Sequence, residues 1–204
     1  HRWLFGLSLR VASAVQFLLP KGQGKFRHLP QFLTALGAGR AVPEIAPKFL
    51  RSMLPERMSP GGRPLYRVGF FSGCATEFMF PGVGKMLVDI LRGLNCEVVF
   101  PAAQGCCGAP VMLSGDFETA KGMAMRNVRA FEDCDYVVTG CATCGSGLRE
   151  YPVYLADAPE ETRRLETFSA KVRDFNEFII DILGTDPGRF RLKPEFEGKT
   201  VTWH

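Results

Sequence analysis

Residues 104–110 read Gln104-Gly105-Cys106-Cys107-Gly108-Ala109-Pro110, so that two adjacent cysteines lie between two glycines. Neighbouring side chains on a regular strand point to opposite faces, and a backbone that brings both thiols to one place must therefore turn. Glycine makes such a turn inexpensive, because it adopts conformations that other residues avoid. The stretch predicts a tight loop that presents two sulfur atoms together.

Three further cysteines are spaced around this pair. The sequence has 31 residues between Cys74 and Cys106, and 33 between Cys107 and Cys141, which forms a Cys-x-x-Cys with Cys144. An isolated free cysteine usually packs as a small apolar residue. Five cysteines in this arrangement indicate a shared site instead.

Length and composition limit the classes of protein to consider. With 204 residues, the chain can form one domain with a sizeable core and an extension. Its seven cysteines are an odd number in a chain too long for a small disulfide scaffold, so we expect a reducing compartment, the cytoplasm or the inner face of its membrane. The net charge of +4 comes from dispersed Lys and Arg, and no basic run or nucleic-acid-binding signature is present.

Strand and helix patterns alternate from residue 63 onward. Short apolar runs predict strands at 66–71, 96–100, 135–139 and 199–203. Between them we expect helices, one with an apolar stripe from Val83 to Leu94 and one capped by Ser114 with Phe117 on its apolar face. Residues 144–157, 159–172 and 175–183 are also predicted to be helical. This order predicts an α/β fold, a parallel sheet of about four strands with helices on both faces.

The five patterned cysteines all follow the ends of predicted strands. In open parallel sheets, sites form outside the carboxyl ends of the strands. Three distant loops are therefore expected to bring these cysteines to one rim of the sheet. Cys96 and Cys134 stand at strand starts, at the opposite edge, and we expect both to be buried core thiols.

The N-terminal residues have a different sequence pattern. Residues 3–19 predict an amphipathic helix that packs through an apolar face formed by Leu4, Leu7, Val11, Val15 and Leu18. Arg10 and several polar residues make the segment unsuitable as a membrane span. Two alternatives are a signal peptide with a cleavage site at Ala12-Ser13-Ala14 and a helix lying on a membrane surface.

Residues 59–62 read as a linker, and we place a boundary there. The expected organisation is a helical linker or extension over 1–62 and a cysteine-rich domain over 63–204. Because the chain starts at His1 and stops within a predicted strand, we expect it to be a piece of a longer polypeptide.

Clustered thiolates favour a limited set of cofactors. Soft sulfur ligands select zinc, Cu(I) or iron–sulfur clusters. A standard zinc site or cubane cluster uses four cysteines, so five leave either one spare thiol or a cluster of unusual shape. Cys141 and Cys144 could alternatively serve as a dithiol/disulfide redox pair.

The motif formed by Cys74, Cys106-Cys107-Gly108 and Cys141-Ala142-Thr143-Cys144 resembles the cysteine-rich CCG domain, over about residues 65–150. This domain occurs in heterodisulfide reductase catalytic subunits, glycolate oxidase iron–sulfur subunits and lactate-utilisation proteins. The resemblance implies an iron–sulfur electron-transfer component, with a [4Fe-4S] cluster, noncubane in heterodisulfide reductase, bound by Cys74, Cys106, Cys107, Cys141 and Cys144. A zinc-stabilised structural or docking domain is the alternative that some relatives suggest.

The same resemblance implies partners. The N-terminal segment is similar to the linker that follows a ferredoxin-like module in the glycolate oxidase type, and family members commonly carry two such motifs. This chain has one. The expected partners are therefore a second CCG repeat, a ferredoxin-like module or subunit and a flavin-containing dehydrogenase subunit, with peripheral membrane association as a further option. We expect an oxidoreductase subunit that is not catalytic by itself.

Overall fold

The computed structural model describes residues 2–19, 26–28, 41–186, 188, 194 and 197–200. Its helices, α-helices except where noted, are α1 (Arg2–Val15), η1 (Gln16–Leu18, 3-10), η3 (Leu50–Ser52, 3-10), α2 (Gly73–Phe78), α3 (Pro81–Gly93), α4 (Ala109–Leu113), α5 (Phe117–Ala130), α6 (Ala142–Arg149), α7 (Tyr151–Leu155), α8 (Pro159–Lys171), α9 (Phe175–Glu177) and η4 (Phe178–Ile182, π). Its strands are β1 (Phe26–His28), β2 (Ala41–Pro43), β3 (Arg57–Met58), β4 (Arg67–Phe70), β5 (Glu97–Val99), β6 (Tyr136–Thr139) and β7 (Val172–Asp174).

The central sheet has the strand order β3-β5-β4-β6-β7. Strand β4 pairs in parallel with β5 and with β6, and β6 pairs in parallel with β7, whereas β3 runs antiparallel at the edge. The predicted α/β fold with a parallel sheet and the three strands near 66–71, 96–100 and 135–139 are confirmed. A separate antiparallel pair, β1 and β2, belongs to the N-terminal segment.

The fourth parallel strand comes from a part of the chain that we predicted differently. Strand β7 begins at Val172, directly after α8, where the sequence pattern predicted the last residue of a helix. Val172 is fully buried, so its burial beside β6 decides the conformation against local helix propensity. Of the strand expected at 199–203, residues 201–203 lie outside the described residues, and Lys199 and Thr200 have no strand conformation.

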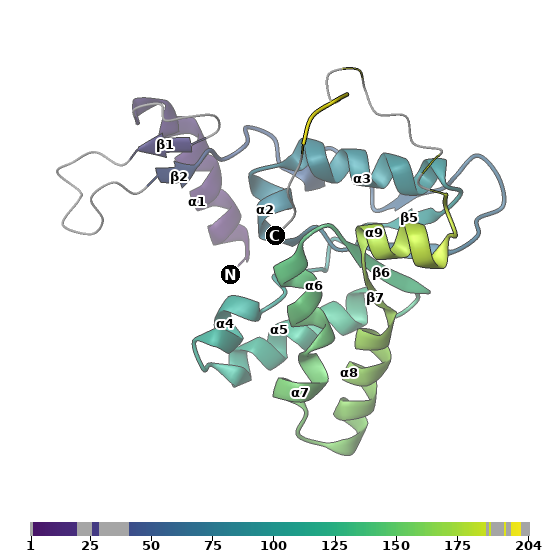
Figure 1. Cartoon of the computed structure of the whole chain (residues 1–204). Coiled ribbons are helices and arrows are strands. Elements are labelled where there is room, and N and C mark those ends of the chain that lie inside the picture. The colour runs from purple at the N-terminus through teal and green to yellow at the C-terminus, as the bar shows by residue number, and fades with distance from the viewer. Residues whose placement is uncertain are drawn as a thin grey trace.

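Helices cover both faces of the sheet, and each face has its own core. Alternate strand residues serve the two cores, as Val137 and Val138 of β6 do. On one face α3 and the α9–η4 segment pack through Leu87, Leu91 and Phe178. On the other, α5, α6, α7 and α8 form a larger core, and the two layers lie on opposite sides of the strands in Figure 1.

Two expectations for the helices need correction. Asp116, not Ser114, caps α5, because its carboxylate accepts a hydrogen bond from the backbone N–H of Thr119 at 3.1 Å. The Ser114 hydroxyl instead donates to the carbonyl of Val111 at 2.7 Å, at the end of α4. Val83, Met86 and Phe117 are exposed, although their spacing placed them on buried stripes. These residues lie at or near the first turns of α3 and α5, where neighbouring elements leave the stripe uncovered.

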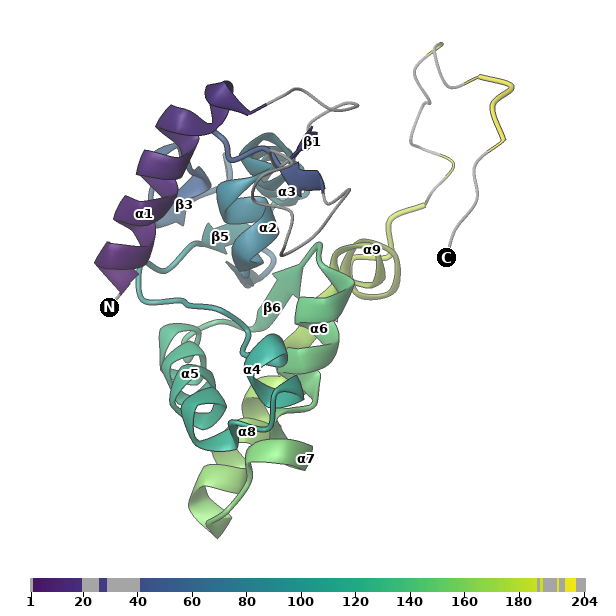
Figure 2. The same ribbon diagram turned by 90° about the vertical axis from the view of Figure 1, so that its left-hand side faces the viewer.

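The N-terminal helix forms as predicted but faces the other way. Helix α1 runs along the outside of the molecule (Figure 2), and Ser13 and Gln16 on its polar side bond to Ile45. The apolar stripe that we expected to pack, from Leu4 to Leu18, is exposed. No described helix is both long enough and apolar enough to span a membrane.

Candidate functional site

The central strand of the parallel sheet places three loops together. Strand β4 lies between β5 and β6, so the chain leaves β4 to one side and later returns to its other side. In open α/β sheets, ligands bind at the carboxyl ends of strands where the strand order reverses in this way. The loops that follow β4, β5 and β6 meet at this edge, which we call the cysteine rim, and each loop leads into a short helix, α2, α4 or α6.

Three of the five predicted cysteines lie close together at the rim. The Cys107 thiol interacts with those of Cys106 and Cys144, which brings the loop after β5 beside helix α6. Cys107 and Cys144 are buried, and Cys106 is half-buried. Cys107 lies in the loop that the sequence predicted, and its side chain is buried there.

Two of the rim thiols, Cys106 and Cys107, have pKa values raised well above the ordinary value of a cysteine. The hydrogen bond with Cys107, together with burial, raises the pKa of Cys106 strongly. The hydrogen bond with Cys106 lowers the pKa of Cys107, but the hydrogen bond with Cys144 and burial outweigh it and raise this pKa to about 11. Converting both of these thiols to thiolates therefore requires a compensating positive charge, which a metal centre supplies.

Glycines at two positions allow the loops to approach each other. Gly73 has a φ of +65°, and a Cβ atom on it would lie 2.8 Å from the Sγ of Cys144. The backbone before Cys74 therefore runs directly against a rim thiol, and a side chain would separate them. Gly108 has a φ of +83°, which supports the predicted turn immediately after Cys107.

The remaining two cysteines lie at helix starts on the same edge. Cys141 is half-buried at the N-cap of α6, one turn from Cys144, and packs against the same core as Cys106. Cys74 is exposed in the first turn of α2. In the part of the chain that the structure describes, no group of three or more His, Cys, Asp or Glu side chains is placed so that it could hold a metal ion. The ligand set of five cysteines stays a prediction.

Gln104 joins two of the rim loops. Its side chain is 1 % exposed, and its amide oxygen accepts a hydrogen bond from the backbone N–H of Ser72 at 3.2 Å. Its amide nitrogen donates to the carbonyl of Phe70 at 3.2 Å. The loop that carries Cys106 is thus fixed to the end of β4, two residues before Cys74.

A buried pair, Asn127 and Tyr151, holds the backbone of the two adjacent cysteines. The Asn127 side chain accepts from the N–H of Gly105 at 2.8 Å and donates to the carbonyl of Cys106 at 2.9 Å and to the Tyr151 hydroxyl at 3.2 Å. That hydroxyl donates to the carbonyl of Cys107 at 2.7 Å. Both side chains are fully buried, and burial is the main cause of the raised pKa of Tyr151.

A buried carboxylate supports the helix that carries Cys74. Glu77 is 6 % exposed, accepts a hydrogen bond from the N–H of Arg51 at 3.1 Å and pairs with the Arg51 guanidinium at 3.7 Å. Arg51 also donates to the carbonyl of Ala102, in the loop after β5. The segment before β3 therefore contributes to the position of two rim loops.

These supporting residues were not predicted from the sequence. Asn127 lies three residues after Ala124 on the buried side of α5, and a polar residue in such a stripe signals a buried polar contact. Gln104 stood inside the stretch that carries the two adjacent cysteines. The roles of Tyr151 and Glu77 depend on contacts over long sequence separations, which no local pattern shows.

Cys96 and Cys134 lie away from the rim, as expected. Both are buried at strand starts, at 0 % and 3 % exposure, and burial is the main cause that raises the pKa of each to about 11. Cys134 packs beside Gly69 and Phe131, and the charged groups around it include Lys171 and Arg67.

The family model CCG, described as a cysteine-rich domain, matches residues 68–149, which include all five patterned cysteines. Residues 68–149 are a CCG domain. The match begins within β4 and ends at the last residue of α6, so it covers the three strands and the three loops that form the cysteine rim. The resemblance seen in the sequence is confirmed.

Several curated proteins are similar to the chain. Lactate utilization protein A 1 of Bacillus cereus strain AH820, lactate utilization protein A of Bacillus thuringiensis strain Al Hakam and lactate utilization protein A 2 of Bacillus mycoides strain KBAB4 are each 37 % identical over 123 residues. That alignment covers 60 % of this chain and 52 % of each relative, so the chain spans about half the length of the curated relatives it matches. No solved structure matches the chain.

The donor set at the rim fits a thiophilic cofactor. Cys106, Cys107 and Cys144 lie close together, Cys141 is one helical turn from Cys144, and the backbone before Cys74 lies against the same Cys144 thiol. Sulfur-rich sites select iron–sulfur clusters, zinc or Cu(I) over hard cations.

Proposed function

We propose that the CCG domain binds a [4Fe-4S] cluster and that the chain transfers electrons in the oxidation of lactate or a similar hydroxyacid. The observation that carries the proposal is the contact among Cys106, Cys107 and Cys144, which joins two loops at the rim of the sheet. The similarity to lactate utilization protein A supports the choice of a hydroxyacid-oxidising system.

In this proposal the ligands are Cys74, Cys106, Cys107, Cys141 and Cys144. A bound cluster supplies one-electron redox chemistry. The protein's own residues hold the ligand loops in position. Gln104 fixes the loop after β5 to β4, and Asn127 and Tyr151 bind the backbone carbonyls of Cys106 and Cys107. Because Cys106 and Cys107 have raised pKa values, their conversion to thiolates on cluster assembly releases protons.

A complete oxidation needs partners for this chain. We infer that a flavin-containing dehydrogenase subunit supplies the electrons and that a ferredoxin-like module or subunit receives or relays them. A second CCG repeat is a further partner in this proposal. We assign the chain to the oxidoreductases as a subunit that is not catalytic alone, and we place it in the cytoplasm, where thiols stay reduced.

Zinc is the second candidate for the site. Cys74 is exposed, so four more enclosed thiols remain, which is the number that a structural zinc ion takes. The domain would then serve as a structural or docking unit. A third candidate, a dithiol/disulfide pair, is favoured by the direct contact of Cys107 with Cys144 rather than by the predicted pair of Cys141 and Cys144.

Metal analysis after anaerobic purification separates the three candidates. We expect the chain, reconstituted with ferrous iron and sulfide, to hold about four iron and four sulfide ions with visible absorption. One zinc ion per chain without colour supports the structural role. Absence of both metals, with two thiols that oxidise and reduce together, supports the dithiol pair and contradicts the cluster.

A further inference from the structure

Helix α1 and the turn after it carry an exposed apolar stripe. Its six members are between 46 and 71 % exposed, and they are Leu4, Leu7, Val11, Val15, Phe17 and Leu18. At 100° per residue, those in α1 lie on one side of the helix. A contiguous stripe of large apolar side chains on a protein surface indicates an interaction site, unlike scattered single residues.

The opposite side of α1 is already bound to the protein. The Gln16 side chain donates to the carbonyl of Ile45 at 2.7 Å and accepts from the N–H of the same residue at 2.9 Å. The Ser13 hydroxyl donates to the carbonyls of Ile45 and Ala46 at 3.2 and 3.4 Å. The helix is thus attached by its polar face, and its apolar face cannot turn inward without breaking these bonds.

The charge of this part of the sequence identifies the partner. Residues 1–43 contain six Arg and Lys residues and no Asp or Glu, whereas residues 44–204 contain 19 basic and 21 acidic residues. Among the α1 side chains that the structure describes, Arg10 is the only charged one. An apolar helix face in a wholly basic segment matches the surface of an anionic lipid bilayer, which offers acyl chains beneath negative headgroups.

We propose that α1 docks the protein flat on an anionic membrane, with the stripe from Leu4 to Leu18 inserted at the headgroup boundary. The polar face, held by Ile45 and Ala46, keeps the helix attached to the domain while its apolar face enters the lipid. At about 1.5 Å per residue, the 14 residues of α1 are too short to cross a bilayer, so the helix lies in the interface. This inference is independent of the cofactor at the cysteine rim.

Co-sedimentation of the whole chain with lipid vesicles tests the proposal. We expect binding to vesicles containing about one third phosphatidylglycerol, and binding at least ~10-fold weaker to pure phosphatidylcholine vesicles or at high salt. The Val11→Asp variant should bind anionic vesicles roughly 10-fold or more weakly, because a charge replaces an inserted apolar side chain. Val153→Asp is the matched control, since Val153 is 74 % exposed on α7, away from the stripe.

Each outcome decides the question. Thermal melting of both variants should match the unsubstituted chain, because both positions are exposed. Leu7→Asp repeats the test on the stripe if Val11→Asp melts early. The proposal fails if the chain does not bind anionic vesicles, or if the stripe and control variants bind equally well. It also fails if α1 variants abolish self-association in light scattering while vesicle binding is absent, because the stripe would then contact a second copy.

Discussion

At the edge where β5 and β6 begin, Cys96 and Cys134 are each packed in an apolar core, whereas at the opposite edge the Cys107 thiol interacts with those of Cys106 and Cys144. Burial alone does not distinguish the two groups of cysteines, since Cys96, Cys134 and Cys107 are all less than 5 % exposed. The side chains around them do distinguish them. At the starting edge the neighbours are apolar side chains and, around Cys134, charged groups, whereas at the rim they include other thiols on loops that side-chain hydrogen bonds hold in place.

The two edges differ in how the backbone of their loops is hydrogen-bonded. At the rim, buried loop backbone must find hydrogen-bond partners away from water, and Gln104, Asn127 and Tyr151 provide them. At the starting edge, the backbone N–H of Cys96 donates to the carbonyl of Leu91 and that of Cys134 to the carbonyl of Phe131, so main-chain bonds suffice there. A cysteine becomes a candidate ligand when side-chain hydrogen bonds fix its loop beside other cysteines.

Among substitutions that weaken the hydrogen bonds at the rim, Asn127→Ala should have the largest effect on the stability of the protein. The change leaves the N–H of Gly105 and the carbonyl of Cys106 without their partner and removes a donor to Tyr151. We expect the free energy of unfolding to fall by about 3 kcal/mol, measured by urea denaturation. Asn176→Ala, at an exposed position, is the control and should change it by less than ~0.5 kcal/mol. Equal effects would show that the rim does not depend on this side chain.

Tyr151→Phe should have a smaller effect at the same place. The ring keeps its stacked contact with Phe168, at 5.8 Å between centroids, while the carbonyl of Cys107 loses its donor. We expect a loss of about 1–2 kcal/mol in the free energy of unfolding. Tyr154→Phe, on the exposed side of α7, should leave it unchanged. A neutral Tyr151→Phe variant would mean that the hydroxyl does not support the cysteine loop.

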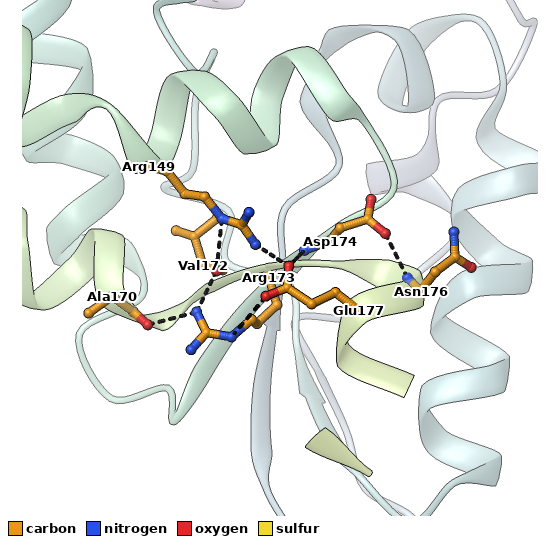
Figure 3. Close-up of polar contacts among 7 residues, drawn as sticks. All are labelled: Arg149, Ala170, Val172, Arg173, Asp174, Asn176 and Glu177. Atoms are coloured by element: carbon orange, nitrogen blue, oxygen red, sulfur yellow. Dashed lines mark hydrogen bonds and ion pairs between the residues drawn. The ribbon is translucent and has the colours of Figure 1, made fainter. Parts of the chain in front are cut away.

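The smallest expected effect on stability comes from Glu177, which lies outside the cysteine rim, just after the end of β7. Figure 3 shows Glu177 between Arg149 and Arg173, where it also accepts a hydrogen bond from the N–H of Asp174 at 3.2 Å. Partial burial raises the pKa of Glu177, but these hydrogen bonds and the two arginine charges outweigh it, so the pKa lies below its ordinary value. Because 34 % of the side chain is exposed, solvent screening limits its contribution to stability.

A carboxylate with a lowered folded pKa stabilises the protein above its unfolded pKa, and this contribution disappears as the pH falls through the folded pKa. Glu177→Gln should therefore lower the free energy of unfolding by less than ~1 kcal/mol at neutral pH. In acid, thermal melting of the variant and of the unsubstituted chain should converge. A difference that grows as the pH falls would contradict this sign.

Sequence patterns were sufficient for much of the fold and for the edge that carries the site. Short apolar runs predicted β4, β5 and β6, and strand-end positions predicted which cysteines share an edge. The spacing of Leu4, Leu7 and Val11 predicted α1 correctly but not its orientation. Periodicity shows that a helix has an apolar face, but what covers that face depends on elements elsewhere in the chain.

The other features that the sequence did not predict also depend on contacts with distant parts of the chain. Val172 follows a helical pattern and becomes a strand because β6 has a free edge beside it. Ser114 and Asp116 are both good helix caps, and only the position of Thr119 decides between them. At the site, the sequence could group the five cysteines, but the contact of Cys107 with Cys144 depends on how Gly73, Gly108 and Tyr151 bring their loops together.

Iron bound per chain by Cys107→Ser and Cys96→Ser, after anaerobic reconstitution, tests the central claim that the rim thiols hold the cofactor. Both thiols are buried, so both substitutions should lower the free energy of unfolding by about 1–3 kcal/mol through a buried hydroxyl. Serine is a poor ligand for soft metals, so we expect Cys107→Ser to lose its iron and Cys96→Ser to keep it. Equal loss of iron in the two variants, or full iron retention by Cys107→Ser, would contradict the assignment of the cluster to the cysteine rim.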